Sequence, residues 1–101
     1  MILVLHTNGS ATLEEGTDFR RFHLEVMPGV DEAKARSLFT LGEIASHELA
    51  WVDEEALYAL GEKSQAPGWR AKAQAMVAAA AKFGWVREQS PAIKTHIVWR
   101  R

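Results

Sequence analysis

The chain has 101 residues, of which 48% are hydrophobic and 25% charged; it has no cysteine and a formal net charge of −1. This length and composition suit one ordinary globular domain and differ from those of disordered chains. The lack of cysteine excludes disulfides, thiolate zinc sites and a cysteine nucleophile. The lack of cysteine fits the cytoplasmic location that we expect, and no apolar run approaches the roughly 18 residues of a membrane span.

The first 27 residues are expected to form two strands. Residues 1–5 are a continuous β-prone run, residues 7–17 contain turn-forming residues, and residues 19–27 alternate apolar and polar side chains. Strict alternation over such a length is typical of a strand with one buried face. The two runs are predicted to pair as an antiparallel hairpin with a long connection.

Residues 28–30 break this pattern, and two helices are expected after them. Asp31 is a suitable N-cap for a helix over residues 31–51, in which apolar residues recur at helical spacing. A shorter helix is predicted over residues 53–63, where Asp53 caps the start and acidic residues occupy the first turn. The internal boundary of the chain is therefore placed at residues 28–30.

The clearest helix of the sequence covers residues 67–84. Pro67 suits its first turn and Gly84 its end, and the residues between them are rich in alanine. The apolar side chains share one stripe, which predicts a buried face made of Trp69, Ala73, Met76, Val77, Ala80 and Phe83. The opposite face of the helix carries small and mildly basic side chains.

A short apolar and charged run at residues 85–88, a turn at residues 89–91 and an alternating run at residues 92–99 predict a C-terminal β-hairpin. The order of elements from residue 53 then resembles a winged helix-turn-helix domain. The segment that carries the resemblance is residues 53–99, DEEALYALGEKSQAPGWRAKAQAMVAAAAKFGWVREQSPAIKTHIVW. The resemblance extends to residues 31–99 if residues 31–51 are the first helix.

The expected fold is therefore α+β and a single domain over residues 1–101. An N-terminal β-hairpin, residues 1–27, precedes a three-helix winged-helix-like unit, residues 31–101, whose C-terminal β-hairpin is the wing. The turn before the longest helix is long, and that helix carries few polar side chains for a recognition helix.

Charge is distributed unevenly along the chain. Residues 1–63 hold five basic and twelve acidic residues, a net charge of −7, whereas residues 64–101 hold seven basic residues and one acidic residue, a net charge of +6. Such asymmetry indicates either a polyanionic partner or the pairing of the two halves with each other. Both interpretations stay open from the sequence.

The leading hypothesis is a small nucleic-acid-binding protein, with double-stranded DNA as the expected partner and a regulatory role. In winged-helix domains the recognition helix enters the major groove and the wing contacts the backbone. The resemblance implies a set of contacts made by Arg70, Lys72 and Gln74 in the groove and by Arg87, Lys94 and Arg100 on phosphates. The alternative is a protein-interaction or dimerisation module that uses the alanine-rich helix face.

Catalysis has little support in the sequence. His6, His23 and His96 fall on expected strands and would form a metal or acid–base cluster only if those strands were neighbours. No phosphate-loop or nucleophile-elbow motif occurs, so we expect no enzyme activity, no cofactor and no metal. The four tryptophans are expected mainly in the core, with a stacking platform for single-stranded nucleic acid as the other interpretation.

Overall fold

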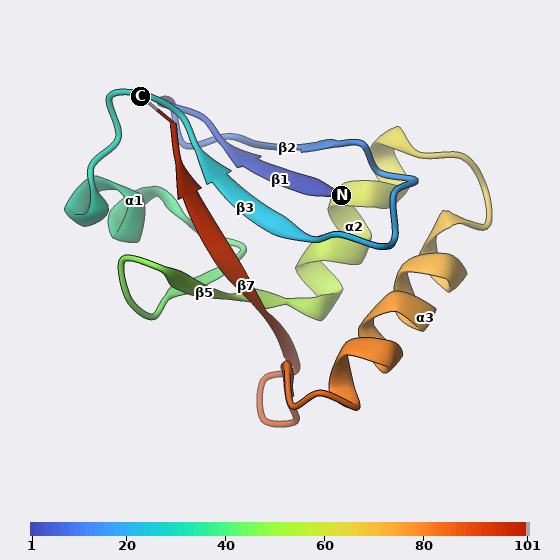
Figure 1. Cartoon of the computed structure of the whole chain (residues 1–101). Helices are drawn as coiled ribbons and strands as arrows, with labels where there is room; N and C mark the ends of the chain where they lie inside the picture. Colours follow the sequence, from blue (N-terminus) through green and yellow to red (C-terminus); the bar gives the residue numbers. More distant parts are fainter. Residues whose placement is uncertain (101) are drawn as a thin grey trace.

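The computed structural model describes residues 1–100. Within them, seven strands form one curled sheet and three helices pack against it (Figure 1). The strands are β1 (Ile2–Leu5), β2 (Ala11–Glu14), β3 (His23–Val26), β4 (Gly42–Ile44), β5 (Leu49–Asp53), β6 (Val86–Arg87) and β7 (Ala92–Trp99). The helices are α1 (Glu32–Leu38), α2 (Glu54–Ser64) and α3 (Trp69–Ala81).

The sheet has mixed strand directions in the order β2-β1-β3-β7-β5-β4. The strands β1 and β2 are antiparallel, β1 and β3 are parallel, and β3 and β7 are parallel. The remaining pairs, β7 with β5 and β5 with β4, are antiparallel. Strand β7 is thus the central strand, with β6 paired to its first residues.

One face of the sheet carries the core. Alternating residues along the central strands are buried, because successive side chains of a strand point to opposite faces. A single apolar cluster joins them to all three helices; it includes Leu3, Leu24, Val52, Ile93 and Ile97 from the strands and Ala35, Leu57, Trp69 and Val77 from the helices. Figure 1 shows α2 and α3 at one end of the sheet and α1 at the other. The intervening residues of the strands point to the opposite face.

The packing of α2 against α3 depends on Gly61 and Trp69. The Trp69 side chain is only 4% exposed, and its indole N–H donates a hydrogen bond to the carbonyl of Gly16 at 2.7 Å. A Cβ atom at Gly61 would lie 2.1 Å from the Trp69 ring, which is far inside van der Waals contact. Glycine at this position therefore allows the indole to lie directly against α2.

Tyr58 on α2 gives a measurable pH effect. Its burial, followed by the neighbouring Glu54 carboxylate, raises the pKa of Tyr58 to about 12. Because the neutral phenol is favoured in the folded state, its contribution to stability is complete below about pH 10, the ordinary pKa of tyrosine. That contribution is lost as the pH rises through the folded pKa.

We expect an ultraviolet titration of tyrosinate in the folded protein to have its midpoint near pH 12, the value set by burial of Tyr58. The signal is specific because the chain contains one tyrosine. The urea-unfolded chain is the control and should titrate near pH 10. Equal midpoints in the two states would show that the phenol is not buried against Glu54.

Several predicted elements are confirmed. Helix α2 covers residues 54–64 where residues 53–63 were expected, and α3 begins at Trp69 within the predicted helix of residues 67–84. Asp31 caps α1 by accepting a hydrogen bond from the Lys34 amide at 2.8 Å. Gly84 has a left-handed φ of 75° shortly after α3, as expected for a residue that ends a helix.

The predicted arrangement of an N-terminal β-hairpin and a winged-helix-like unit is wrong. The strands β1 and β3 are parallel neighbours rather than a hairpin, and the hairpin partner of β1 is β2, inside the predicted loop of residues 7–17. The predicted helix of residues 31–51 ends at Leu38, and β4 and most of β5 follow. Strand β7 pairs with β3 and β5 in the centre of a large sheet, whereas a wing is a peripheral hairpin.

Candidate functional site

The six residues predicted to bind nucleic acid do not form one surface. Arg70 on α3 bonds to two carboxylates of α2: Nη2 lies 2.7 Å from Oε2 of Glu55, and Nη1 lies 2.7 Å from Oε1 of Glu62. These hydrogen bonds, that with Glu55 first, raise the pKa of Arg70. Much of its charge is therefore matched within the fold.

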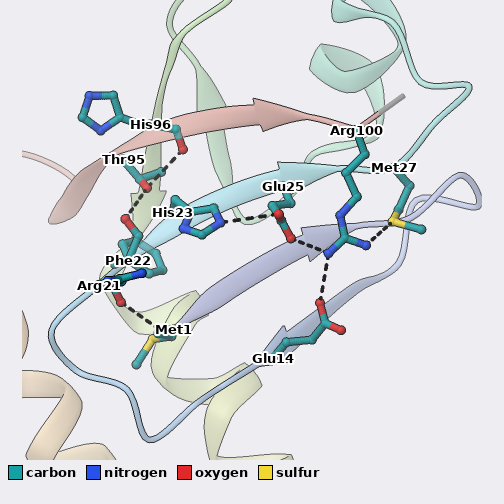
Figure 2. Close-up of polar contacts among 10 residues, drawn as sticks. All are labelled: Met1, Glu14, Arg21, Phe22, His23, Glu25, Met27, Thr95, His96 and Arg100. Atoms are coloured by element: carbon teal, nitrogen blue, oxygen red, sulfur yellow. Dashed lines mark hydrogen bonds and ion pairs between the residues drawn. The ribbon is translucent and has the colours of Figure 1, made fainter.

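Two further predicted residues are also in ion pairs. Arg87 bonds through Nη1 to the carboxylate of Glu43. Arg100 lies 2.5 Å from the carboxylate of Glu25 and 3.7 Å from that of Glu14, as the dashed contacts in Figure 2 show. All of these carboxylates belong to the acidic half of the chain. The charge asymmetry is thus partly satisfied by pairing inside the protein.

The remaining three predicted residues lie in different environments. Lys72 is exposed on α3. Gln74 lines a broad depression of about 640 Å³ whose wall carries Asp53, Glu54 and Glu55. That wall of carboxylates would repel a phosphate backbone. Lys94 lies on β7 beside a second, smaller groove.

This second groove has the more distinctive chemistry, and we call it the aromatic–basic groove. Its volume is about 240 Å³. It lies between the segment before β3, the C-terminal part of α3 and the β6–β7 hairpin. Its lining residues are Phe19, Arg20, Arg21 and Phe22, then Met76, Ala79, Ala80 and Phe83, then Trp85, Ile93 and Lys94.

The strand pairing creates the aromatic–basic groove. Both β6 and β3 pair with the same edge of β7, but β6 pairs with Ala92 and Ile93, whereas β3 pairs from His96 onward. The Lys94 amide still donates to the Trp85 carbonyl at 2.7 Å, so the notch on that edge is left at Thr95. The buried Thr95 hydroxyl donates to the Phe22 carbonyl at 3.2 Å and so holds the segment before β3 at the notch (Figure 2).

The aromatic–basic groove is apolar at its floor and positive at its rim. Arg20, Arg21 and Lys94 make no ion pair with any carboxylate in residues 1–100, and no acidic residue lines the groove. Arg20 and Arg21 are exposed, and Lys94 is half-buried. Unpaired cations beside apolar surface favour a ligand that is negatively charged and also has an apolar or aromatic part.

Cations and aromatic rings also alternate next to the aromatic–basic groove. The Lys94 ammonium lies 4.9 Å from the centroid of the Trp85 ring and 6.0 Å from that of Trp51. The Arg87 guanidinium lies 5.2 Å from the Trp51 centroid. These distances are within the range of cation–π attraction. The chemistry of the groove therefore extends across β6 and β5.

Sequence reasoning missed Arg20, Arg21 and Phe83. The first two lie in the sequence Phe-Arg-Arg-Phe of residues 19–22, and this interleaving of aromatic and basic residues was a usable signal. Phe83 was expected in the core, but its side chain is 78% exposed, because α3 ends at Ala81 and the chain has left the helical path. Lys94 is the one predicted site residue that lines the aromatic–basic groove.

The three histidines predicted to lie on strands do not converge, and His6 follows the end of β1 at Leu5. His23 and His96 are cross-strand partners, but the His23 ring is directed at Glu25, with Nε2 3.6 Å from the carboxylate, and the His96 ring points away from it (Figure 2). His6 bonds instead to the Thr12 hydroxyl at 2.8 Å. In residues 1–100 no group of three or more His, Cys, Asp or Glu side chains is placed to hold a metal ion.

Comparison with known proteins gives no family for this fold and site. No protein-family model, no curated protein and no solved structure matches the chain. No relative therefore tests the resemblance to winged helix-turn-helix domains, and the arrangement of elements that it implied differs from the observed sheet. In the described part of the chain, no helix has both the length and the apolar character needed to cross a membrane.

Proposed function

We propose that the protein binds nucleic acid and that the aromatic–basic groove is its contact surface. The observation that carries the proposal is the cluster of three cations, Arg20, Arg21 and Lys94, that have no carboxylate partner within residues 1–100 and surround a groove lined with aromatic rings. Cationic side chains follow a phosphate backbone, and aromatic side chains contact bases. The pairing of Arg70, Arg87 and Arg100 with carboxylates favours this groove over the contacts predicted for those three residues from the sequence.

Double-stranded DNA and a regulatory role are the narrower form of the proposal. They rest on the sequence, where residues 64–101 carry a net charge of +6, and on Lys72, which is exposed on α3. A protein partner is the second candidate, because the 78% exposed Phe83 beside an apolar groove also suits an interface. These candidates differ in which surface they use and in how binding depends on salt.

The proposal is tested by fluorescence anisotropy with mixed-sequence oligonucleotides at roughly 50 and 200 mM salt, a range over which phosphate contacts lose much of their strength. The test variant is Arg20→Gln with Arg21→Gln, both exposed, so folding should be preserved. We expect weaker binding and a salt slope, log Kd against log salt, that is lower by about 1.5 because two phosphate contacts are lost.

Two pairs of substitutions serve as matched controls, since each also removes two positive charges. Lys34→Gln with Lys63→Gln lies outside the aromatic–basic groove and should change affinity much less. Arg70→Gln with Lys72→Gln tests the recognition-helix placement. A loss confined to this second pair would move the contact surface to α3. No binding at low salt by folded protein would contradict nucleic-acid binding and favour a protein partner.

A further inference from the structure

We infer that the aromatic–basic groove receives an unpaired base of a single-stranded nucleic acid, with the neighbouring phosphates on Arg20, Arg21 and Lys94. This inference rests on the proposed function, since it names the form of nucleic acid that the same site would select. It differs from the expectation of double-stranded DNA, whose bases are stacked inside the helix and reach proteins only by their edges.

The size of the aromatic–basic groove is the first reason. Its volume of about 240 Å³ is below the range of roughly 300–1,000 Å³ that encloses a drug-sized ligand. It therefore suits one flat ring system rather than a whole cofactor, and it is too small to admit a duplex. A base turned out of a single strand is a ligand of that size and shape.

The rings at the aromatic–basic groove are the second reason. Phe83 is 78% exposed, which leaves its ring free of most protein contacts, and Trp85 is partly exposed. Large aromatic side chains usually lie in the core, and an exposed one beside an apolar groove is an available stacking surface. Phe19 and Phe22 line the groove from the segment before β3.

The placement of the cations is the third reason. Lys94 is held 4.9 Å from the Trp85 ring, so a base stacked beside Trp85 would have its phosphate near an ammonium. Arg20 and Arg21 lie on the segment before β3, with the backbone of Arg21 held by a hydrogen bond from the Met1 nitrogen at 2.8 Å. A short strand can thus place a base in the groove and phosphates on its rim.

The test compares three ligands of equal length at one salt concentration: a mixed-sequence DNA single strand, its duplex, and a strand of abasic sites that keeps the phosphates but has no bases. We expect the single strand to bind the full-length protein more tightly than the abasic strand by roughly 5- to 150-fold, the factor that one stacked base contributes. The duplex should also bind more weakly than the single strand.

Phe83→Ala is the matching protein variant, and its exposure means that folding should be unaffected. It should lower single-strand affinity by roughly 5-fold or more and leave affinity for the abasic strand unchanged. Phe83→Tyr keeps the ring and should retain affinity. Val98→Ala is the control for an exposed apolar side chain outside the groove, since Val98 is 43% exposed on β7, and it should have no effect.

The possible failures are distinguishable. Equal affinity for the single strand and the abasic strand would overturn base recognition while leaving nucleic-acid binding intact. Tighter binding of the duplex would overturn it in favour of double-stranded DNA. Binding of none of the three ligands would refute the proposed function itself, and polyglutamate binding as tightly as the single strand would show that the site accepts any polyanion.

Discussion

Replacing Trp69 with alanine is expected to lower the free energy of unfolding by about 3–5 kcal/mol. The Trp69 side chain is 4% exposed and joins α3 to α2, and its ring also lies 6.5 Å from that of Phe19. Its removal leaves a cavity and an unpaired carbonyl at Gly16, which otherwise accepts the indole N–H. A domain of this length has a total stability of roughly 5–15 kcal/mol, so the change should be large.

Urea unfolding followed by circular dichroism measures this change, because the midpoint falls with stability at a constant slope. Trp69→Phe is the companion variant. It keeps an aromatic ring but loses the hydrogen bond to Gly16, and it should cost about 1–3 kcal/mol. A cost below about 1 kcal/mol for Trp69→Ala would contradict the packing of the indole between α2 and residues 16–19.

Replacing Gly61 with alanine should destabilise the protein by about 1–3 kcal/mol, although alanine is the better helix former. A Cβ atom at this position would meet the Trp69 ring at 2.1 Å, and that ring is enclosed and cannot easily move. In an exposed helix the same change would stabilise by about 1 kcal/mol. The sign of the effect therefore depends on the indole.

A double-mutant cycle tests this dependence. In the Trp69→Ala background, Gly61→Ala should become neutral or stabilising by up to about 1 kcal/mol, because the clash is gone and the helix propensity remains. Gly61 and Trp69 are in contact, so the losses of unfolding free energy caused by the two substitutions should not be additive. Additive costs would show that Gly61 is required for a reason other than the approach of Trp69.

Local sequence signals predicted the elements whose structure is decided locally. Residues 67–84 combine strong helix formers with Pro67 and Gly84 at the ends, and α3 forms within that range. Residues 92–99 alternate apolar and polar side chains, and β7 covers them. In both segments the hydrophobic period agrees with the side that the fold buries, which makes the pattern readable without knowledge of the neighbours.

The sequence did not reveal the pairing of the strands, because partners far apart in the chain leave no local signal. A parallel β1–β3 pair and an antiparallel hairpin bury the same residues of the two strands. The prediction of one helix over residues 31–51 was wrong for a related reason. Their apolar residues fit a helical spacing, yet β5 at Leu49–Asp53 buries Ala50 and Val52 in strict alternation within the sheet.

The candidate site was only partly predictable. Lys94 was identified from the positive charge of the second half of the chain, but the cations beside it, Arg20 and Arg21, come from the acidic half. They line the same groove as Lys94 because β3 and β7 are neighbouring strands. The segments that meet there are more than 70 positions apart in the sequence. Likewise, the ion pairs that match Arg70 and Arg100 with carboxylates are decided by tertiary structure.

The most direct measurement is a titration of isotope-labelled protein with a short DNA single strand, followed by amide chemical shifts in NMR spectra at low and raised salt. We predict salt-sensitive shifts concentrated at residues 19–22, 76–85 and 93–94, the three segments that contribute the lining of the aromatic–basic groove. Shifts centred on Arg70 and Lys72 of α3, or no shifts at any residue of the folded protein, would contradict the assignment of this groove as the nucleic-acid-binding surface.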